Sequence, residues 1–389
     1  YPVVSGRTMD WVFPFNDSLM VNPRGGRMEG GLGASGSSAV WTVRYGSVVS
    51  SINTWLSTAT SSLTGRRFDY VRDGGTDGIN EAGLGAHLLY LEATQYASAG
   101  AAGGRAGVSY ARLVRYLLDT CGTVGEAVAA MRAVWVAGAK VEVSPGAPGI
   151  ALGSHVAVED ASGDSAVFEF EGGEVRVYWG RNYTVMANDP PMPGQIANLR
   201  RYQPFTRVTV PPGDIASTSR FVRAAYFLHY LPRSTDGDTM VAEVRSVIQT
   251  AAAPLGAPAD DDPELGVYPT WWTSVTNYRD RLYYWGWGLN PNFIWVDLMK
   301  LQSAGAFEES SPTRLLDPLD PSLVGEVSDL FRPVAGPPQL RAEARAETQT
   351  HIAYRATFVV GLGVALSAAS VLPRIRSWRA RGASLSESA

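Results

Sequence analysis

The chain has 389 residues, a formal net charge of −4 and one cysteine. This length allows one large domain or two ordinary ones, and the slightly acidic balance argues against a nucleic-acid binder that works through bulk positive charge. One cysteine excludes a disulfide framework and any zinc site with several cysteine ligands.

Residues 1–301 have the pattern of one globular unit, in which strand-like and helical runs are separated by turns. The first run, residues 1–4, is strand-like, and the sequence opens on it directly rather than on the pattern of a signal peptide. Helical periodicity follows at residues 110–120 and 123–133. The second of these helices opens on a Thr-x-x-Glu capping box.

An antiparallel meander is the clearest strand prediction, because three alternating runs are joined by turns of two to four residues. A further strand is expected at residues 183–187, and helices at residues 219–231 and 239–252. Strands followed by helices and more strands predict a layered α+β fold. The three strands of the meander are Ser154–Asp160, Ser165–Glu171 and Glu174–Trp179.

The residues after 301 have a different composition. Residues 302–350 are rich in Pro, Glu, Arg and Ala and show little periodicity, which predicts a flexible linker. Residues 351–389 contain an uncharged apolar run, 356–372, and an arginine-rich end. The run is at the lower length limit for a transmembrane helix, and the basic end would then lie in the cytoplasm with the globular unit outside. A docked apolar helix is the alternative, since Gly, Ala and Ser dominate the run.

No motif predicts a metal site or a nucleotide cofactor. The four histidines are far apart in the sequence, and residues 260–262 (DDD) lie between prolines without the spacing of an EF-hand loop. The glycines at 31 and 33 do not complete a dinucleotide-binding fingerprint. We therefore expect neither a metal nor a cofactor.

Five separated segments carry the functional signal, because they follow one another in a recognisable order across most of the first 301 residues. They are residues 6–11 (GRTMDW), 77–84 (DGINEAGL), 185–190 (VMANDP) with 197–199 (ANL), 219–224 (SRFVRA), and 271–275 (WWTSV) leading to 283–285 (YYW) and 295–298 (WVDL). Taken together, these segments resemble the choloylglycine hydrolase and penicillin V acylase family.

The resemblance implies a four-layer αββα sandwich of the N-terminal-nucleophile hydrolase type. It also implies hydrolysis of linear amide C–N bonds in a small molecule, such as penicillin V, an acyl-homoserine lactone or a conjugated bile acid. The family nucleophile is a cysteine that processing makes N-terminal, and its free α-amine serves as the base. An exported, periplasmic or extracellular enzyme that forms a homotetramer is the corresponding expectation.

Four residues receive roles from this resemblance. Asp10 would orient the amine and the sulfur of the nucleophile, and Arg7 would favour the thiolate through its positive charge. Asn188 would donate its side-chain amide to the oxyanion, and Arg220 would lie near the nucleophile. The residues alone allow other roles: a structural ion pair between Arg7 and Asp10, a turn asparagine at 188, and a helix-surface arginine at 220.

Tyr90 stands ten residues after Asn80, where bile-salt hydrolases carry asparagine and penicillin V acylases carry tyrosine. The resemblance makes the backbone N–H of Tyr90 the second oxyanion donor and favours penicillin V or long-chain acyl-homoserine lactones over bile acids. Asn80 itself is expected to shape the turn at residues 80–83 rather than to act on the substrate.

The family nucleophile is expected about ten residues before Tyr1. Cys121 ends a predicted helix and has no free amine, so it is interpreted as a packing residue. Ser5 is interpreted as an internal strand residue without a nearby base. Three hypotheses stay open: a nucleophile upstream of this chain, a family member that binds acyl amides without turnover, or a fragment without a function of its own.

Overall fold

The computed structural model describes residues 2–334 apart from 13, 16, 33–36, 53–57, 62–66, 70–73, 99–102, 142–149 and 259–267. Its contacts divide the chain into two units. The larger unit takes in Tyr1–Met9, Pro14–Ala252 and Thr270–Leu340. The smaller one takes in Asp10–Phe13, Ala253–Pro269 and Arg341–Ala389.

Within the smaller unit, Trp11 joins two segments that are far apart in the sequence. Its backbone N–H donates to Pro269 O at 3.3 Å. Its ring centroid lies 6.0 Å from that of Tyr268.

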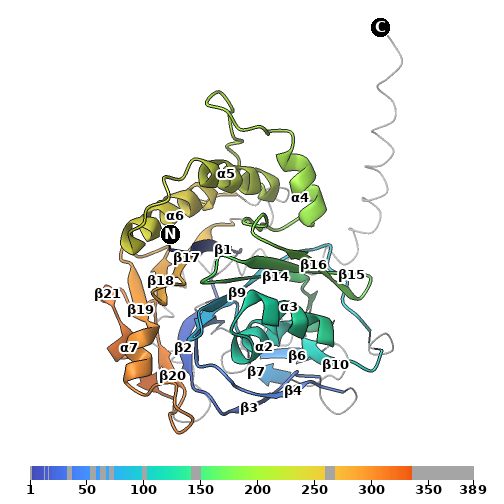
Figure 1. The fold of residues 1–389 in the computed structure, drawn as a ribbon, viewed down its shortest axis with the longest axis vertical. Helices are drawn as coiled ribbons and strands as arrows, with labels where there is room; N and C mark the ends of the chain where they lie inside the picture. Colours follow the sequence, from blue (N-terminus) through green and yellow to red (C-terminus); the bar gives the residue numbers. More distant parts are fainter. Residues whose placement is uncertain are drawn as a thin grey trace. The chain divides into compact units, whose positions relative to one another are not determined.

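The larger unit is built around a sheet of nine described strands, several of which are labelled in Figure 1. Strands β2 and β5 lie in its interior and are buried along their whole length, whereas β16 at one end alternates between exposed and half-buried residues. In sheet order the strands are β16 (Glu174–Trp179), β15 (Ser165–Glu171), β14 (Ser154–Asp160), β9 (Leu84–Tyr90), β8 (Asp77–Asn80), β5 (Ser47–Ser51), β2 (Ser18–Asn22), β20 (Arg314–Leu316) and β22 (Arg332–Pro333).

A second sheet of five described strands packs against the first, and β1 is its edge strand. Two tryptophans fill its interior: Trp272 and Trp285 are fully buried, with ring centroids 5.8 Å apart. In sheet order the strands are β1 (Val4–Asp10), β17 (Thr270–Asn277), β18 (Leu282–Trp287), β19 (Ile294–Asp297) and β21 (Gly325–Glu326).

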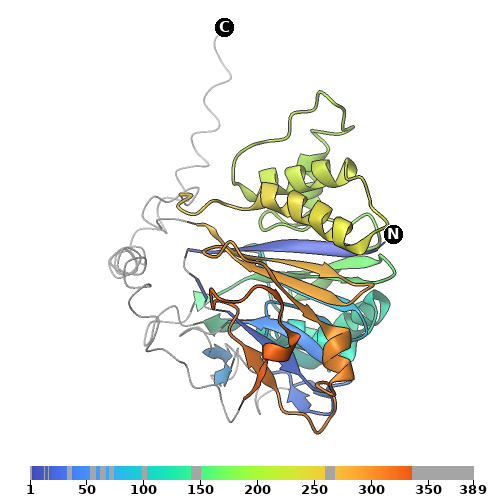
Figure 2. The ribbon, with the colours of Figure 1, turned by 90° about the vertical axis from the view of Figure 1, so that its left-hand side faces the viewer.

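Helices cover the outer face of each large sheet, which completes the expected four layers, αββα. Helices α2 (Leu113–Thr120) and α3 (Val124–Ala133) pack on strands β8, β9 and β14 of the nine-stranded sheet. Helix α6 (Gly237–Ala251) packs on β17, and α5 (Ser217–His229) packs on α6. In Figure 2 the blue β1 and the orange β17 lie between the yellow helices and the other sheet.

The close approach of α6 to β1 depends on a glycine. A Cβ atom at Gly6 would lie 3.1 Å from Cγ2 of Ile248 on α6, which is tighter than ordinary van der Waals contact. The glycine of the GRTMDW segment therefore allows helix α6 to pack closely on the sheet. Successive side chains of a strand point to opposite faces, so the neighbouring Arg7 points away from the helix.

Shorter elements complete the described part of the chain. They are β3 (Arg27–Glu29) with β4 (Val40–Thr42), β10 (Ala106–Ser109) with β11 (Val134–Ala137), the sheet of β13 (Ile150–Ala151), β12 (Ala139–Val141), β6 (Thr58–Ser61) and β7 (Arg67–Asp69), helices α4 (Met192–Leu199) and α7 (Leu298–Ser303), and the 3-10 turns Tyr110–Arg112 and Ser328–Leu330.

Most of the predicted elements are confirmed. The meander strands have the predicted bounds, and the four helices are found within about two residues of them, the first one opening as a 3-10 turn. The strand predicted at residues 183–187 is wrong, because this segment has no ladder partner. Its apolar side chains, among them Tyr183 and Val185, pack instead with Met192 and Phe221 of α4 and α5.

The linker predicted from residue 302 begins too early. Strands β20 and β22 of the nine-stranded sheet and β21 of the five-stranded sheet all come from residues 314–333. These residues therefore belong to the folded unit. Residues 335–350 and the apolar run at 356–372 lie outside the described residues.

Candidate functional site

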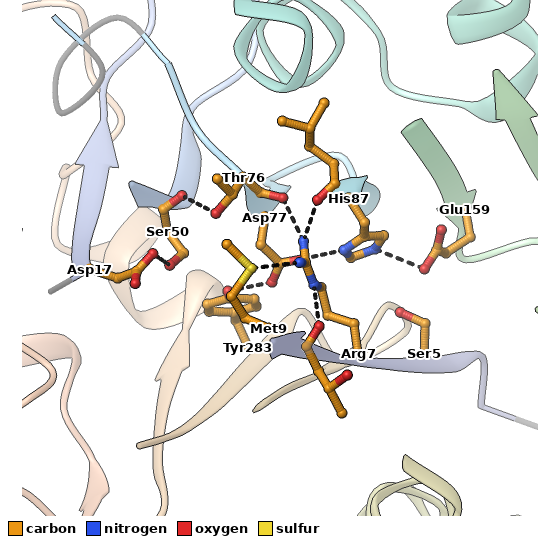
Figure 3. A network of polar contacts seen from close by, with 12 residues as sticks. Ser5, Arg7, Met9, Asp17, Ser50, Thr76, Asp77, His87, Glu159 and Tyr283 are labelled. Atoms are coloured by element: carbon orange, nitrogen blue, oxygen red, sulfur yellow. Dashed lines mark hydrogen bonds and ion pairs between the residues drawn. The ribbon is translucent and has the colours of Figure 1, made fainter. Parts of the chain in front are cut away.

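Arg7 is held between the two large sheets (Figure 3). Its Nη1 donates to Thr76 O at 2.8 Å and to Leu88 O at 2.9 Å, and lies 3.8 Å from Oδ1 of Asp77. Its guanidinium carbon stands 4.9 Å from the ring centroid of Trp272. The residue is 8% exposed, and because arginine keeps its charge in proteins, it fixes a positive charge in the space between the sheets.

The two carbonyls that bind Arg7 belong to the β8–β9 hairpin. Asn80 shapes its turn, since Asn80 Oδ1 accepts from Ala82 N at 3.1 Å and Leu84 N at 3.0 Å. Gly83 adopts φ +92°, a conformation that favours glycine. The structural role predicted for Asn80 is therefore confirmed.

A buried histidine, which the sequence did not single out, lies at the centre of this site. His87 on β9 stands directly opposite Asp77 on β8, and its Nδ1 bonds Asp77 Oδ1. Its Nε2 lies 2.8 Å from Oε1 of Glu159 on β14 and 3.1 Å from the hydroxyl of Tyr278. On the other side, the hydroxyl of Tyr283 donates to Asp77 Oδ2 at 2.6 Å. Figure 3 shows Asp77, His87, Glu159 and Tyr283 of this network.

The charges of this network are mutually stabilising. Burial alone lowers the pKa of His87, but the charges of Glu159 and Asp77, with their hydrogen bonds, outweigh it and raise the pKa to about 10. Burial raises the pKa of the Asp77 and Glu159 carboxyls, but the charge of His87 and its hydrogen bonds leave the pKa of each below its ordinary value. His87 is therefore an imidazolium at neutral pH, held between two carboxylates.

Ser5 is closer to titratable groups than the sequence suggested. Its Oγ lies 2.7 Å from the hydroxyl of Tyr278, which donates to Glu159 Oε1 at 2.9 Å and lies beside His87. The expectation that no base stands nearby is therefore wrong. However, an imidazolium has no lone pair with which to accept a proton, so His87 does not activate Ser5 as a nucleophile at neutral pH.

The loop that carries Asn188 is fixed just after the end of β9, close to Tyr90 in the sequence. The carboxylate of Asp189 accepts from the backbone N–H groups of Glu92 at 2.9 Å and Ala93 at 3.3 Å. This holds the loop that carries Asn188 against the residues that follow Tyr90. Gln195 of α4 fixes the loop from its other side, because its Nε2 donates to Asn188 O at 3.0 Å.

The ladder of β9 decides where the backbone N–H of Tyr90 points. Leu91 N–H bonds Gly153 O next to β14, whereas Leu88 N–H bonds Thr76 O on the β8 side. Since N–H groups alternate along a strand, that of Tyr90 points toward the β8 side, as Leu88 does. Leu88 is also one of the two residues that bind Arg7 through their carbonyls, so Arg7 is anchored two residues before Tyr90, on the side of β9 to which the Tyr90 N–H points.

Arg220 lies in the first turn of α5, and α4 ties this turn to the loop that carries Asn188. Gln195 Nε2 reaches Ser217 Oγ at 3.2 Å as well as the loop, and Asn198 Nδ2 donates to Thr218 O at 3.3 Å. Asp10 is the last residue of β1, three positions after Arg7, and belongs to the smaller unit.

An apolar hollow adjoins this cluster. Residues 182–185, helix α4 and helix α5 form its walls. One of its lining residues, Phe221, follows Arg220 in the sequence. Its apolar lining residues are Tyr183, Val185, Met192, Ile196, Leu199 and Phe221.

Cys121 is confirmed as a packing residue. It caps the C-terminal end of α2, is buried, and its carbonyl accepts from Asn80 Nδ2 at 2.7 Å. Burial raises the pKa of its thiol to about 11. Because the thiolate is the nucleophilic form, this cysteine is inert at neutral pH. No group of three or more metal-ligating side chains occurs in the part of the chain that the structure describes.

Comparison with known proteins identifies the fold. The family of linear amide C–N hydrolases described as the choloylglycine hydrolase family matches residues 1–306. A penicillin V acylase of Pectobacterium atrosepticum is 28% identical over 316 residues, which cover 78% of this chain and 79% of that protein.

Two solved structures are similar to this one. The penicillin V acylase from Agrobacterium tumefaciens has a TM-score of 0.70 at 28% identity, covering 86% of this chain and 94% of its own. A mutant conjugated bile acid hydrolase from Clostridium perfringens has a TM-score of 0.60 at 20% identity, covering 76% and 89%, and shows the fold alone. These likenesses confirm the four-layer fold that the sequence resemblance implies.

Proposed function

The chain belongs to the choloylglycine hydrolase family of linear amide C–N hydrolases, and from this premise we propose that it supports hydrolysis of an acyl amide by a cysteine encoded upstream of Tyr1. The observation that carries the proposal is the arrangement around the end of β9: Arg7 binds the carbonyl of Leu88, and the carboxylate of Asp189 holds the loop of Asn188 on the backbone of Glu92, two residues after Tyr90. This arrangement provides a fixed positive charge and two donors for a developing oxyanion.

The sheet topology supports an upstream nucleophile strand. Strand β1 has one described hydrogen-bonded neighbour, β17, and is the edge of its sheet. An edge strand presents backbone groups that another strand can pair with. A strand that precedes β1 in the gene product and returns along this edge would bring its first residue into the layer that holds Arg7.

The proposed reaction uses the thiolate of that cysteine to attack the amide carbonyl, while its α-amine takes up the thiol proton. The oxyanion that forms accepts hydrogen bonds from the Asn188 amide and the Tyr90 N–H. Collapse of the intermediate breaks the C–N bond, and the α-ammonium returns the proton to the leaving amine. Water then hydrolyses the thioester with the α-amine as base, which releases the carboxylic acid.

The substrate we propose is an amide with an apolar acyl group, of the penicillin V or acyl-homoserine lactone type. The apolar hollow beside Phe221 supports an acyl chain or an aryl group. The 28%-identical relative, a penicillin V acylase, supports the same class. Conjugated bile acids are the third candidate substrate class. Tyr90 disfavours them, because bile-salt hydrolases carry asparagine at this position.

The test is expression of the gene product with the residues encoded upstream of Tyr1. We expect it to release the acid from penicillin V or a long-chain acyl-homoserine lactone, and replacement of its N-terminal cysteine by alanine to abolish release. The 389-residue chain as printed is the matched control and should give no turnover. Turnover by this control, or a stop codon directly upstream, would contradict the proposal.

A binding protein on the same fold is the second candidate. It is favoured by Cys121, whose buried thiol leaves the printed chain without a reactive cysteine among its residues. This candidate is supported if the printed chain binds acyl amides saturably and the longer gene product does so without turnover. A fragment without function of its own would do neither.

We further propose that the protein acts outside the cytoplasm, in the periplasm or extracellularly. No helix among the residues that the structure describes could cross a membrane, and the run at 356–372 lies beyond them. Deletion of residues 351–389 should move the protein from the membrane fraction to the soluble fraction if this run is an anchor. An unchanged distribution would favour the docked helix instead.

A further inference from the structure

The carbonyls that hold Arg7 are direct sequence neighbours of the Asp77–His87 pair. Thr76 precedes Asp77 on β8, and Leu88 follows His87 on β9. The two are also bonded to each other, since Leu88 N–H donates to Thr76 O at 2.8 Å. The side-chain pair and the docking point of Arg7 are therefore parts of one rigid piece of the hairpin.

Asp77 is the carboxylate closest to Arg7, yet the two are not hydrogen-bonded. Nη1 of Arg7 is 3.8 Å from Asp77 Oδ1, beyond hydrogen-bond distance. Both oxygens of Asp77 are taken by other donors, Oδ1 by His87 and Oδ2 by Tyr283. As long as the imidazolium occupies Oδ1, the guanidinium stays on the backbone carbonyls.

Glu159 holds the imidazolium from its other side. Its Oε1 lies 2.8 Å from Nε2 of His87 and also accepts from Tyr278. Two buried cations, Arg7 and His87, thus face two carboxylates in one network. Among the described residues, the titratable groups in contact with this imidazolium are Asp77 from β8, Glu159 from β14 and Tyr278, the residue after β17. Arg7 of β1 and Tyr283 of β18 act on Asp77. Arg7 also acts on the buried Asp17: burial raises the pKa of this carboxyl to about 7, and the charge of Arg7 opposes the rise.

We propose that His87 is a positioning residue for Arg7: its imidazolium occupies Asp77 and Glu159, so that Arg7 stays on the carbonyls of Thr76 and Leu88 with its charge available to the nucleophile. This inference rests on the proposed function, because it gives the charge of Arg7 a thiolate to stabilise. His87 touches neither substrate nor nucleophile and acts through Arg7 alone.

The variant His87→Gln tests the proposal, because glutamine is polar but uncharged. Without the imidazolium, Asp77 attracts Arg7 into a direct ion pair. The positive potential at the nucleophile then falls, and the pKa of its thiol rises by about one unit, an order-of-magnitude expectation for a change in one nearby charge. The measurement is the pH profile of iodoacetamide alkylation and of kcat/KM for the gene product with its upstream residues.

We expect the alkylation profile and the acid limb of kcat/KM of His87→Gln to move to higher pH, with about tenfold less thiolate below the new pKa. KM should change far less than kcat, because the acyl-binding hollow is untouched. Cys121 does not interfere with the alkylation, because its thiol pKa of about 11 keeps it protonated over this range.

His155→Gln is the matched control. His155 is also buried, at 1% exposed, and its Nδ1 lies 3.5 Å from a carboxylate oxygen of Glu169 in the same sheet. It belongs to a different cluster from the one around Arg7. His155→Gln therefore also removes a buried histidine, but it should leave the pH profiles of alkylation and kcat/KM unchanged.

A second measurement does not depend on activity. The chain has four histidines, so nitrogen-15 NMR of the histidine-labelled 389-residue chain can follow His87 directly. Both ring nitrogens should carry protons up to about pH 9, given the pKa of about 10. In a separate arginine-labelled sample, the Arg7 guanidinium resonance should shift in His87→Gln. A neutral His87 ring at pH 8 overturns the inference.

The two proposals fail in different ways. Hydrolysis by the wild type, with unchanged pH profiles in His87→Gln, overturns the positioning role and leaves the proposed function in place. A gene product without hydrolysis and without a reactive thiol overturns the proposed function and the positioning role with it.

Discussion

Replacing Asn188 by alanine is expected to lower kcat of the full gene product by about 10²–10³-fold, with little change in KM. The side-chain amide is proposed to meet the oxyanion, which exists in the transition state and not in the bound amide, so its loss affects kcat rather than binding. Steady-state hydrolysis of penicillin V or an acyl-homoserine lactone measures both constants.

The loop should keep its place in this variant. Gln195 holds it through the backbone carbonyl of Asn188, and Asp189 holds it through its own carboxylate, and neither contact uses the Asn188 side chain. Asn292→Ala is the matched control: this side chain also donates to a backbone carbonyl, that of Pro321 at 3.2 Å, far from β9 in the sequence. If both variants keep wild-type kcat, Asn188 is not an oxyanion donor.

Replacing Asp77 by asparagine is expected to reduce the free energy of unfolding by about 3–5 kcal/mol, the usual cost of removing one partner from a buried ion pair. Asp77 is 0% exposed and is the partner of both His87 and Tyr283. When residue 77 has no charge, the imidazolium of His87 keeps one carboxylate partner, Glu159, and Arg7 loses its nearest carboxylate. Urea unfolding of the 389-residue chain at pH 7 measures the loss.

The pH dependence of this loss has a definite sign. Burial raises the pKa of Asp77, but the charge and hydrogen bond of His87 and the charge of Arg7 outweigh it, so the folded-state pKa lies below the ordinary 3.8. A depressed carboxyl pKa stabilises the fold above the unfolded pKa, and this contribution is lost as pH falls through the folded pKa. The difference between wild type and Asp77→Asn should therefore be full at pH 7 and shrink below about pH 4.

An exposed ion pair provides the contrast. Asp329 is 72% exposed and lies 2.5 Å from Lys300, so water already solvates most of its charge. Asp329→Asn should change the unfolding free energy much less than Asp77→Asn. Equal losses in the two variants would mean that the Asp77 network is not a buried charge cluster.

The elements that the sequence predicted well are those whose pattern is local. The meander has alternating side chains and short turns, and the helix at 124–133 has its Thr123 cap, so neighbouring residues define both. The strands at 314–333 have two or three residues each, too few to show a period. Residues 183–187 alternate like a strand, but helices α4 and α5 take up their apolar side chains.

The same contrast between local patterns and long-range contacts applies to the residues of the candidate site. Arg7, Asn188 and Arg220 were found through segments that resemble a family, and Tyr90 through its spacing from Asn80, whereas His87 lies between the segment 77–84 and Tyr90 and was not predicted. One partner of His87 could have been predicted from the local sequence. Asp77 and His87 are equally far from the turn at 80–84, so a hairpin pairs them. Glu159 and Tyr278 could not be predicted as partners, because they reach His87 only when distant strands and the second sheet assemble.

The pairing of β2 with β20 has a consequence for how the chain folds. Leu19 pairs with Leu316, so the interior strand β2 gains its second neighbour only after about 300 further residues have been made, which takes roughly 15 to 60 s at 5–20 residues per second on the ribosome. Until then this edge of the buried strand β2 stays open to pairing with other chains. The nine-stranded sheet can therefore be completed only late in synthesis, and a nascent chain that stalls before residue 314 keeps this edge of β2 unpaired.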